Sequence, residues 1–137
     1  MYKVIEITTN DGGVMSLPLK STASTIFRFK QFTGKELIDS IANIMTTISD
    51  QDLGMAGNSL TQLTEEVSRL AFIMNKQATA KNSGDLSNLN EYEYIDWLDQ
   101  FDPMAFIEKI SDILEVYMQG ARGTSVAKKN PAQLNEE

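Results

Sequence analysis

Cysteine and histidine are both absent from the 137 residues of this chain. Without cysteine there is no disulfide, no thiolate nucleophile and no zinc ribbon, which fits a reducing compartment. Without histidine there is no side chain that normally exchanges protons near pH 7, and the commonest transition-metal ligand is missing. We therefore predict that the protein is not an enzyme and that it has no catalytic, cofactor-binding or metal-binding residues.

Basic residues are also few: 12 Lys and Arg stand against 19 Asp and Glu, for a net charge of −7 and a pI near 4.6. Nucleic-acid binding depends on clustered Lys and Arg, so protein partners are favoured. No apolar run approaches the roughly 18 residues of a membrane span. Residues 2–10 are polar and alternating, unlike a signal peptide. We expect a cytoplasmic protein that binds neither nucleic acid, nor membrane, nor a small-molecule substrate.

Hydrophobic periodicity predicts a mainly α fold with about five helices, a small N-terminal β-hairpin and a disordered C-terminal tail. One domain covers residues 1–119, with the hairpin at 2–19, and a flexible polar tail covers residues 120–137. The hairpin is indicated by alternating residues on both sides of the turn at 10–13, and Pro18 indicates that the second strand lies at an edge or at an end near that residue.

The helices are expected near residues 22–32, 33–48, 59–78, 90–101 and 103–119, separated by polar connections at 49–59 and 79–89. Thr33 and Glu36 have the spacing of a capping box, Asn90 can cap the fourth helix, and Gly120 follows the last one. Asp50 to Gly54 resembles the opening of a calcium loop. Met55 and Thr61 occupy the positions that such a loop gives to Gly and Glu, so we predict no calcium site.

An acidic cluster without any Lys or Arg occupies the fourth predicted helix and its end: Glu91, Glu93, Asp96, Asp99 and Asp102. A glycosidase-like carboxylate pair is one interpretation, but the short chain leaves little material for the cleft that such a pair needs. A solvated face is the simplest interpretation, and partner binding is the other. As candidate partner-binding residues we select acidic residues of this helix and basic residues of the tail: Glu93, Asp96, Asp99, Arg122, Lys128 and Lys129.

Charge is also divided along the chain. Residues 1–35 carry five Lys and Arg against two carboxylates, a net +3, and residues 91–115 carry eight carboxylates against Lys109, a net −7. These segments can attract one another within one molecule or between molecules, and self-association stays open. Five aromatic residues in the same region either form an exposed binding cluster or pack in the core, and helical spacing favours the core: Tyr92, Tyr94, Trp97, Phe101 and Phe106.

Four segments stand out by their order and spacing: residues 17–20 (LPLK), 25–37 (TIFRFKQFTGKEL), 70–77 (LAFIMNKQ) and 94–98 (YIDWL). Together they resemble tail assembly chaperones of long-tailed bacteriophages and prophages, especially those of Gram-positive hosts. The resemblance covers most of residues 15–119. The N-terminal hairpin is a departure, because some members are wholly helical.

The resemblance implies a non-enzymatic protein of the host cytoplasm that binds the tape measure protein, keeps its apolar helical segments soluble, helps to recruit the tail tube protein and is not retained in the mature virion. In many phages a programmed frameshift near the end of this reading frame adds a second domain, and Lys128-Lys129-Asn130 is compatible with a slippery codon run. The alternative is a small acidic regulatory adaptor or inhibitor that mimics nucleic acid through residues 91–102.

Overall fold

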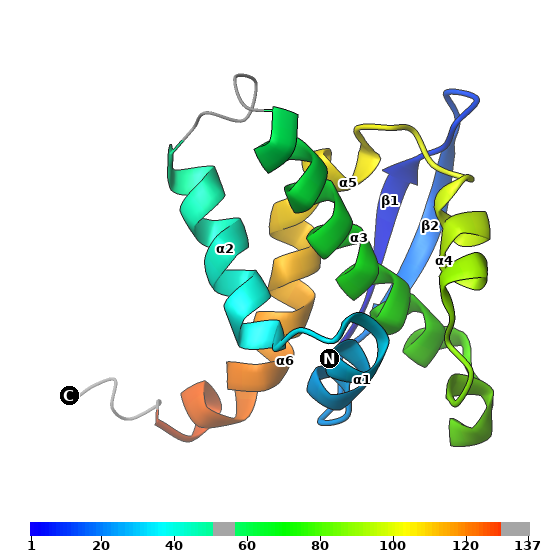
Figure 1. Ribbon diagram of the computed structural model, residues 1–137. Helices are drawn as coiled ribbons and strands as arrows, with labels where there is room; N and C mark the ends of the chain where they lie inside the picture. Colours follow the sequence, from blue (N-terminus) through cyan, green and yellow to red (C-terminus); the bar gives the residue numbers. More distant parts are fainter. Residues whose placement is uncertain (51–56, 130–137) are drawn as a thin grey trace.

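The computed structural model describes the backbone of residues 1–50 and 57–129, and the side chains of residues 1–49 and 60–119. The chain folds into a β-hairpin and a layer of helices around one long helix (Figure 1). The hairpin consists of β1 (Tyr2–Thr8) and β2 (Val14–Lys20). The helices are α1 (Thr25–Thr33), α2 (Leu37–Asp50), α3 (Gly57–Thr79), the 3₁₀ helix η1 (Ser83–Leu86), α4 (Glu91–Leu98), α5 (Ala105–Glu108) and α6 (Ile110–Lys129). The predicted mainly helical fold with an N-terminal hairpin is confirmed.

Helix α3 is the centre of the fold, and it contacts β2 and each of the other α-helices. Its middle turns are buried around almost the whole circumference: Val67, Leu70, Ala71, Phe72, Ile73 and Met74. A helix that is apolar on all sides is stable only where other elements cover every side. Figure 1 shows this arrangement, with α2 and α4 on opposite sides of α3 and the hairpin beside it.

The two strands of the hairpin pair antiparallel, with Val4 opposite Pro18. Met1 and Ser21 exchange both of their backbone hydrogen bonds, at 3.0 and 2.8 Å. Because bonded and non-bonded pairs alternate along antiparallel strands, the carbonyls of Pro18 and Lys20 point away from β1. Side chains of α3 satisfy both, since Asn75 Nδ2 donates to the Pro18 carbonyl at 2.9 Å and Gln77 Nε2 donates to the Lys20 carbonyl at 2.7 Å. The predicted edge position of Pro18 is confirmed.

The predicted capping box at Thr33 is wrong. Thr33 ends α1, where its hydroxyl donates to the Phe29 carbonyl at 2.8 Å and accepts from the Lys35 amide at 3.0 Å. Gly34 follows in the left-handed conformation, with φ of 79°, and its amide donates to the Lys30 carbonyl. Thr-Gly therefore stops a helix here, as left-handed glycine commonly does.

The last predicted helix differs in two ways from the observed one. It is divided at Lys109 into α5 and α6, and α6 continues past the expected end at Gln119 to Lys129. A glycine in a helix interior costs only about 1 kcal/mol, so Gly120 and Gly123 do not terminate α6. The boundary between domain and tail that we predicted at residue 120 thus lies within a helix. The flexibility of the tail stays a prediction, and residues 130–137 lie outside the described residues.

The other predicted elements agree with the structure apart from their ends. Asn90 caps α4 by accepting the Glu93 amide at 2.9 Å, as predicted. The connection after α3 contains η1, whose amide at Asp85 is capped by Asn82. Residues 51–56, which include most of the segment that we compared with a calcium loop, lie outside the described residues.

Candidate binding surface

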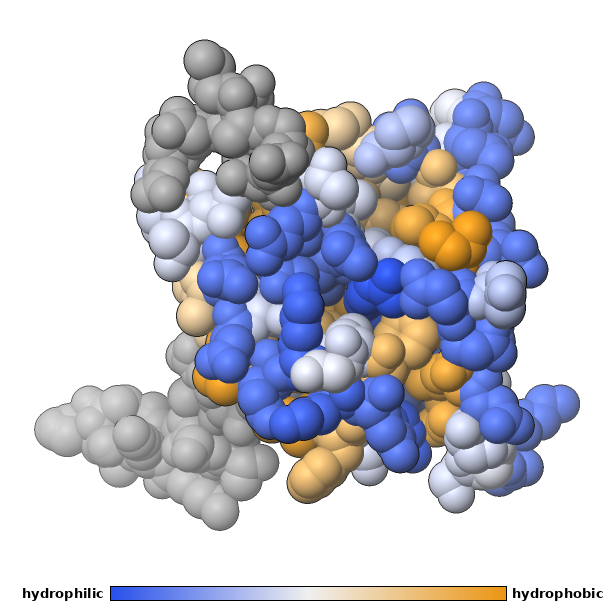
Figure 2. Space-filling view, viewed as in Figure 1, coloured by the Kyte–Doolittle hydropathy of each residue, from blue (hydrophilic) through white to orange (hydrophobic). Residues whose placement is uncertain are grey.

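A groove of about 550 Å³ lies between the first turns of α3, the outer side of α4 and the turn at Pro103. Its lining is mostly apolar: Leu60, Thr61, Thr64, Glu65, Arg69, Tyr94, Ile95, Leu98, Pro103 and Met104. Ile95 and Met104 are 42% and 41% exposed, far more than apolar residues of the core. Figure 2 shows apolar surface in this part of the molecule, bordered by hydrophilic residues. Such a surface can bury apolar side chains of a partner.

The groove exists because α4 is short. Its contacts with α3 are made at residues 68–76, where the Tyr94 hydroxyl bonds the Ser68 hydroxyl at 2.6 Å and Trp97 Nε1 donates to Asn75 Oδ1 at 3.0 Å. The first turns of α3 near Leu60 extend beyond these contacts. Ile95 and Leu98 line the groove beside this stretch; Ile95 is exposed, and Leu98 is partly buried and also packs against the core.

Arg69 stands at one end of the groove and fixes α4 to α3. Its Nη1 and Nη2 donate to the two oxygens of Glu91 at 2.8 and 2.7 Å, and its Nε donates to Glu65 at 3.2 Å. Its guanidinium carbon lies 4.3 Å from the centre of the Tyr94 ring and 5.2 Å from that of Phe32. The hydrogen bond to Glu91 raises the pKa of Arg69, and the same bond lowers the pKa of Glu91.

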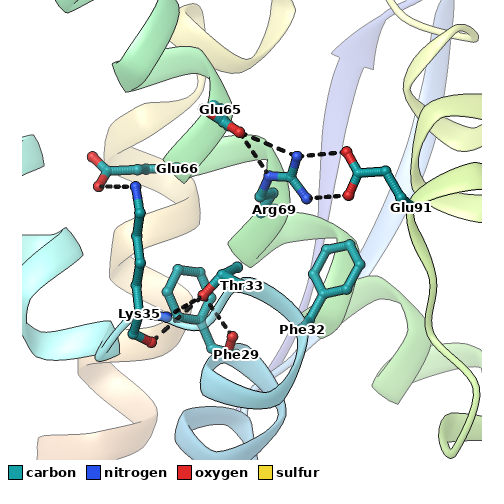
Figure 3. A pocket seen from close by; sticks show the side chains of 8 residues that line it. All are labelled: Phe29, Phe32, Thr33, Lys35, Glu65, Glu66, Arg69 and Glu91. Carbon is teal, nitrogen blue, oxygen red and sulfur yellow. Dashed lines mark hydrogen bonds and ion pairs between the residues drawn. The ribbon is translucent and has the colours of Figure 1, made fainter.

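A second hollow, of about 190 Å³, lies on the other side of Arg69, between α1, α3 and α4 (Figure 3). It is lined by Phe29, Phe32, Thr33, Lys35, Glu65, Glu66, Arg69 and Glu91. The Glu66 side chain is only 4% exposed, and its nearest cation is Lys35, whose Nζ lies 3.9 Å from Glu66 Oε2. We name this hollow the Glu66 pocket.

None of the acidic residues that we selected from the sequence lines the groove. Glu93 forms an ion pair with Lys76 of α3 at 2.7 Å. Asp96 and Asp99 are exposed, and the Asp99 carbonyl accepts Asn10 Nδ2 at 2.7 Å. In the acidic cluster of residues 91–102, Glu91 and Glu93 form ion pairs with basic residues of α3. The cluster therefore does not present five free carboxylates. The side chains of Arg122, Lys128 and Lys129 lie outside those described, and their role stays a prediction.

The aromatic residues are core residues, with one exception. Tyr94, Trp97, Phe101 and Phe106 are buried and pack against one another, with Tyr94 stacked on Trp97 and the other pairs tilted or edge to face. Phe72 of α3 packs edge to face against Tyr94 and Trp97. Tyr92 is 85% exposed. The predicted core packing is confirmed for the four buried rings.

The two oppositely charged segments meet within the molecule at one ion pair, between Lys3 Nζ and Glu115 Oε1 at 3.1 Å. Both side chains are partly exposed, so this pair contributes little to stability. It supports the intramolecular interpretation at this position and leaves self-association a prediction.

Sequence reasoning missed the groove and the Glu66 pocket. Ile95 does not share the helical face of Tyr94 and Trp97, and this difference could have identified it as an exposed apolar residue. Glu66 lies on the apolar stripe of α3, between Leu63 and Leu70, which could have marked it as a buried carboxylate.

Among the residues that the structure describes, no group of three or more acidic side chains is arranged to hold a metal ion. None of the described helices has the length and hydropathy needed to cross a membrane. Comparison of the chain with protein-family models, curated proteins and solved structures found no match.

Proposed function

We propose that this chain is a non-enzymatic phage tail assembly chaperone that binds the tape measure protein and assists assembly of the tail tube. The sequence resemblance suggests the client, and the apolar groove beside α4 is the observation that supports client binding most directly. A helical client segment would place apolar side chains against Ile95, Leu98 and Met104. The groove then acts as a temporary cover for client surface that the finished tail buries.

The charges around the groove favour a client helix with basic residues beside its apolar face. Asp96 and Asp99 are exposed, and they directly follow the groove residues Ile95 and Leu98 in the sequence. Charged residues at the border of an apolar contact mainly set orientation and association rate, while the apolar contacts supply most of the affinity. In this proposal the protein acts in the host cytoplasm, contacts the tail tube protein during assembly and is not retained in the mature virion.

The direct test is co-expression with the tape measure protein encoded near this gene. We expect this chain to co-purify with that protein and to raise its soluble fraction. Ile95→Asp should weaken the interaction at least about tenfold, because a carboxylate would replace an apolar contact in the groove. Tyr92→Asp is the matched control, since Tyr92 lies on the same helix and is exposed but does not line the groove.

Two outcomes would count against parts of the proposal. A tape measure protein that neither co-purifies nor gains solubility contradicts the chaperone function. Equal binding by the Ile95→Asp and Tyr92→Asp variants contradicts the groove as the contact surface. The acidic adaptor remains the alternative, and the neighbouring genes distinguish the two, since tail genes favour the chaperone and a regulatory operon favours the adaptor.

A further inference from the structure

The Glu66 pocket holds one more negative than positive side chain. Glu65, Glu66 and Glu91 face it together with Lys35 and Arg69. Arg69 is already occupied, because its guanidinium donates to both Glu91 and Glu65. Arg69 therefore balances only one of these two carboxylates, and Lys35 is left as the one partner of Glu66, the most buried of the three carboxylates.

Glu66 Oε2 is buried and accepts no hydrogen bond in the described part of the protein. Lys35 Nζ is 3.9 Å away, which is too long for a hydrogen bond, and the Lys35 side chain is 52% exposed. A buried carboxylate without a donor is costly, so an additional donor at this position would be favourable. Figure 3 shows the Glu66 carboxylate turned toward the Lys35 amine at one side of the pocket, with Phe29 and Phe32 also lining it.

We propose that the Glu66 pocket binds one alkylammonium or alkylguanidinium group, whose N–H donors reach Glu66 Oε2. The excess negative charge selects a cation, and the bare oxygen selects a cation that carries hydrogen-bond donors. Phe32, which is only partly buried, offers apolar surface to the methylene stem of such a group. The volume of about 190 Å³ is many times the roughly 10–15 Å³ that one water needs by the same measure, so the pocket has room for a group of several heavy atoms. Lys35 moves toward solvent when the group enters.

Two kinds of molecule can supply this cationic group: a free small amine, or a protein partner through a Lys or Arg side chain. Only the second source rests on the proposed function, in which the client would place a basic side chain in the Glu66 pocket and apolar side chains in the groove. The two hollows share Glu65 and Arg69 in their walls, so one partner can reach both.

The first experiment titrates the isotope-labelled full chain with n-butylammonium, ethylguanidinium and tetramethylammonium chloride at constant ionic strength, observed by NMR at the Glu66 carboxyl carbon. We expect saturable binding of n-butylammonium or ethylguanidinium, with a Kd on the order of millimolar for a group of this size. Tetramethylammonium has the same charge without N–H donors, so it should not saturate the site. Equal binding of tetramethylammonium, or shifts that never saturate for any probe, overturns the proposal.

Variants then test the residues. Glu66→Gln keeps the shape of the side chain and should weaken probe binding by about tenfold or more, because a charged hydrogen bond is lost. Glu36→Gln is the control, since Glu36 is an exposed carboxylate that pairs with Lys30 outside the pocket. Lys35→Met removes the competing cation from a half-exposed position and should strengthen binding several-fold. Unchanged binding in Glu66→Gln, or weaker binding in Lys35→Met, contradicts the site.

Binding of the tape measure protein by the same variants separates the two sources. Weaker client binding in Glu66→Gln, with n-butylammonium binding also lost, assigns the group to the client. Unchanged client binding, with n-butylammonium binding lost, assigns it to a free amine. If the client does not bind the wild-type chain while n-butylammonium does, the proposed function fails and the Glu66 pocket stands.

Discussion

Asn75 joins three elements of the fold through one side-chain amide. From α3 its Nδ2 donates to the Pro18 carbonyl on the free edge of β2 at 2.9 Å, and its Oδ1 accepts the indole N–H of Trp97 of α4 at 3.0 Å. The residue is buried. We therefore predict that Asn75→Ala is among the most destabilising substitutions of a polar residue in this protein.

The magnitude follows from the partners that Asn75→Ala leaves behind. The Trp97 indole N–H and the Pro18 carbonyl would each lose a hydrogen bond in a buried region, and each loss costs about 1–3 kcal/mol. The free energy of unfolding should fall by about 3 kcal/mol in total, allowing for partial access of water to the strand edge. That is a large share of the roughly 5–15 kcal/mol by which domains of this size are stable.

Urea unfolding at 25 °C measures this loss. Far-UV circular dichroism is the better probe, because the substitution changes the surroundings of Trp97, the only tryptophan. Asn43→Ala is the control, since Asn43 is exposed on α2 and alanine favours helix there. A loss below about 1 kcal/mol for Asn75→Ala would refute the view that these two hydrogen bonds hold the hairpin and α4 to α3.

Three further predictions concern single contacts. Arg69→Met should lower the free energy of unfolding by about 1–2 kcal/mol, a loss limited by the exposure of Glu91 to solvent. A double-mutant cycle with Glu91→Gln should give a coupling energy near 1 kcal/mol, and a coupling near zero would contradict this. Ser40→Ala should stabilise the protein by about 1 kcal/mol in the same urea assay, because the buried Ser40 hydroxyl has no hydrogen-bond partner in the described residues; a lower midpoint would argue otherwise. Burial raises the pKa of Tyr94, so its stabilising contribution is complete below about pH 10 and is lost as the pH rises through the folded-state pKa. Tyr94→Phe should remove this alkaline loss in pH-dependent thermal unfolding, and an unchanged loss would show that another group causes it.

The elements of the fold follow largely from local sequence patterns. Alternation on both sides of residues 10–13 predicted the hairpin, and the missing N–H of Pro18 predicted its edge. The apolar spacing of α3 predicted its span to within two residues at each end. The errors arose where a local signal has two interpretations. Thr33 has the spacing of a helix start relative to Glu36, but with Gly34 it forms a helix end. Gly120 is compatible with both the end and the interior of a helix.

Much less of the candidate binding surface could be predicted from the sequence. Residues 91–102 were recognised as acidic, but the ion partners Arg69 and Lys76 belong to another helix. The same limit applies to the groove, because periodicity shows that Ile95 and Leu98 are apolar without showing how far α3 extends past α4. The position of Glu66 on an apolar stripe was visible, but the distance to Lys35 was not.

By itself the sequence determined the kind of protein: an acidic chain without cysteine or histidine, whose apolar residues repeat with the periods of one hairpin and several helices. Those properties are local, since a strand or helix period is set by residues a few positions apart. Only the tertiary structure decided which carboxylates of α4 are paired, where the groove opens and why the Glu66 oxygen lacks a donor. These features depend on how separate helices cross one another, and the crossing is set by packing around α3 as a whole.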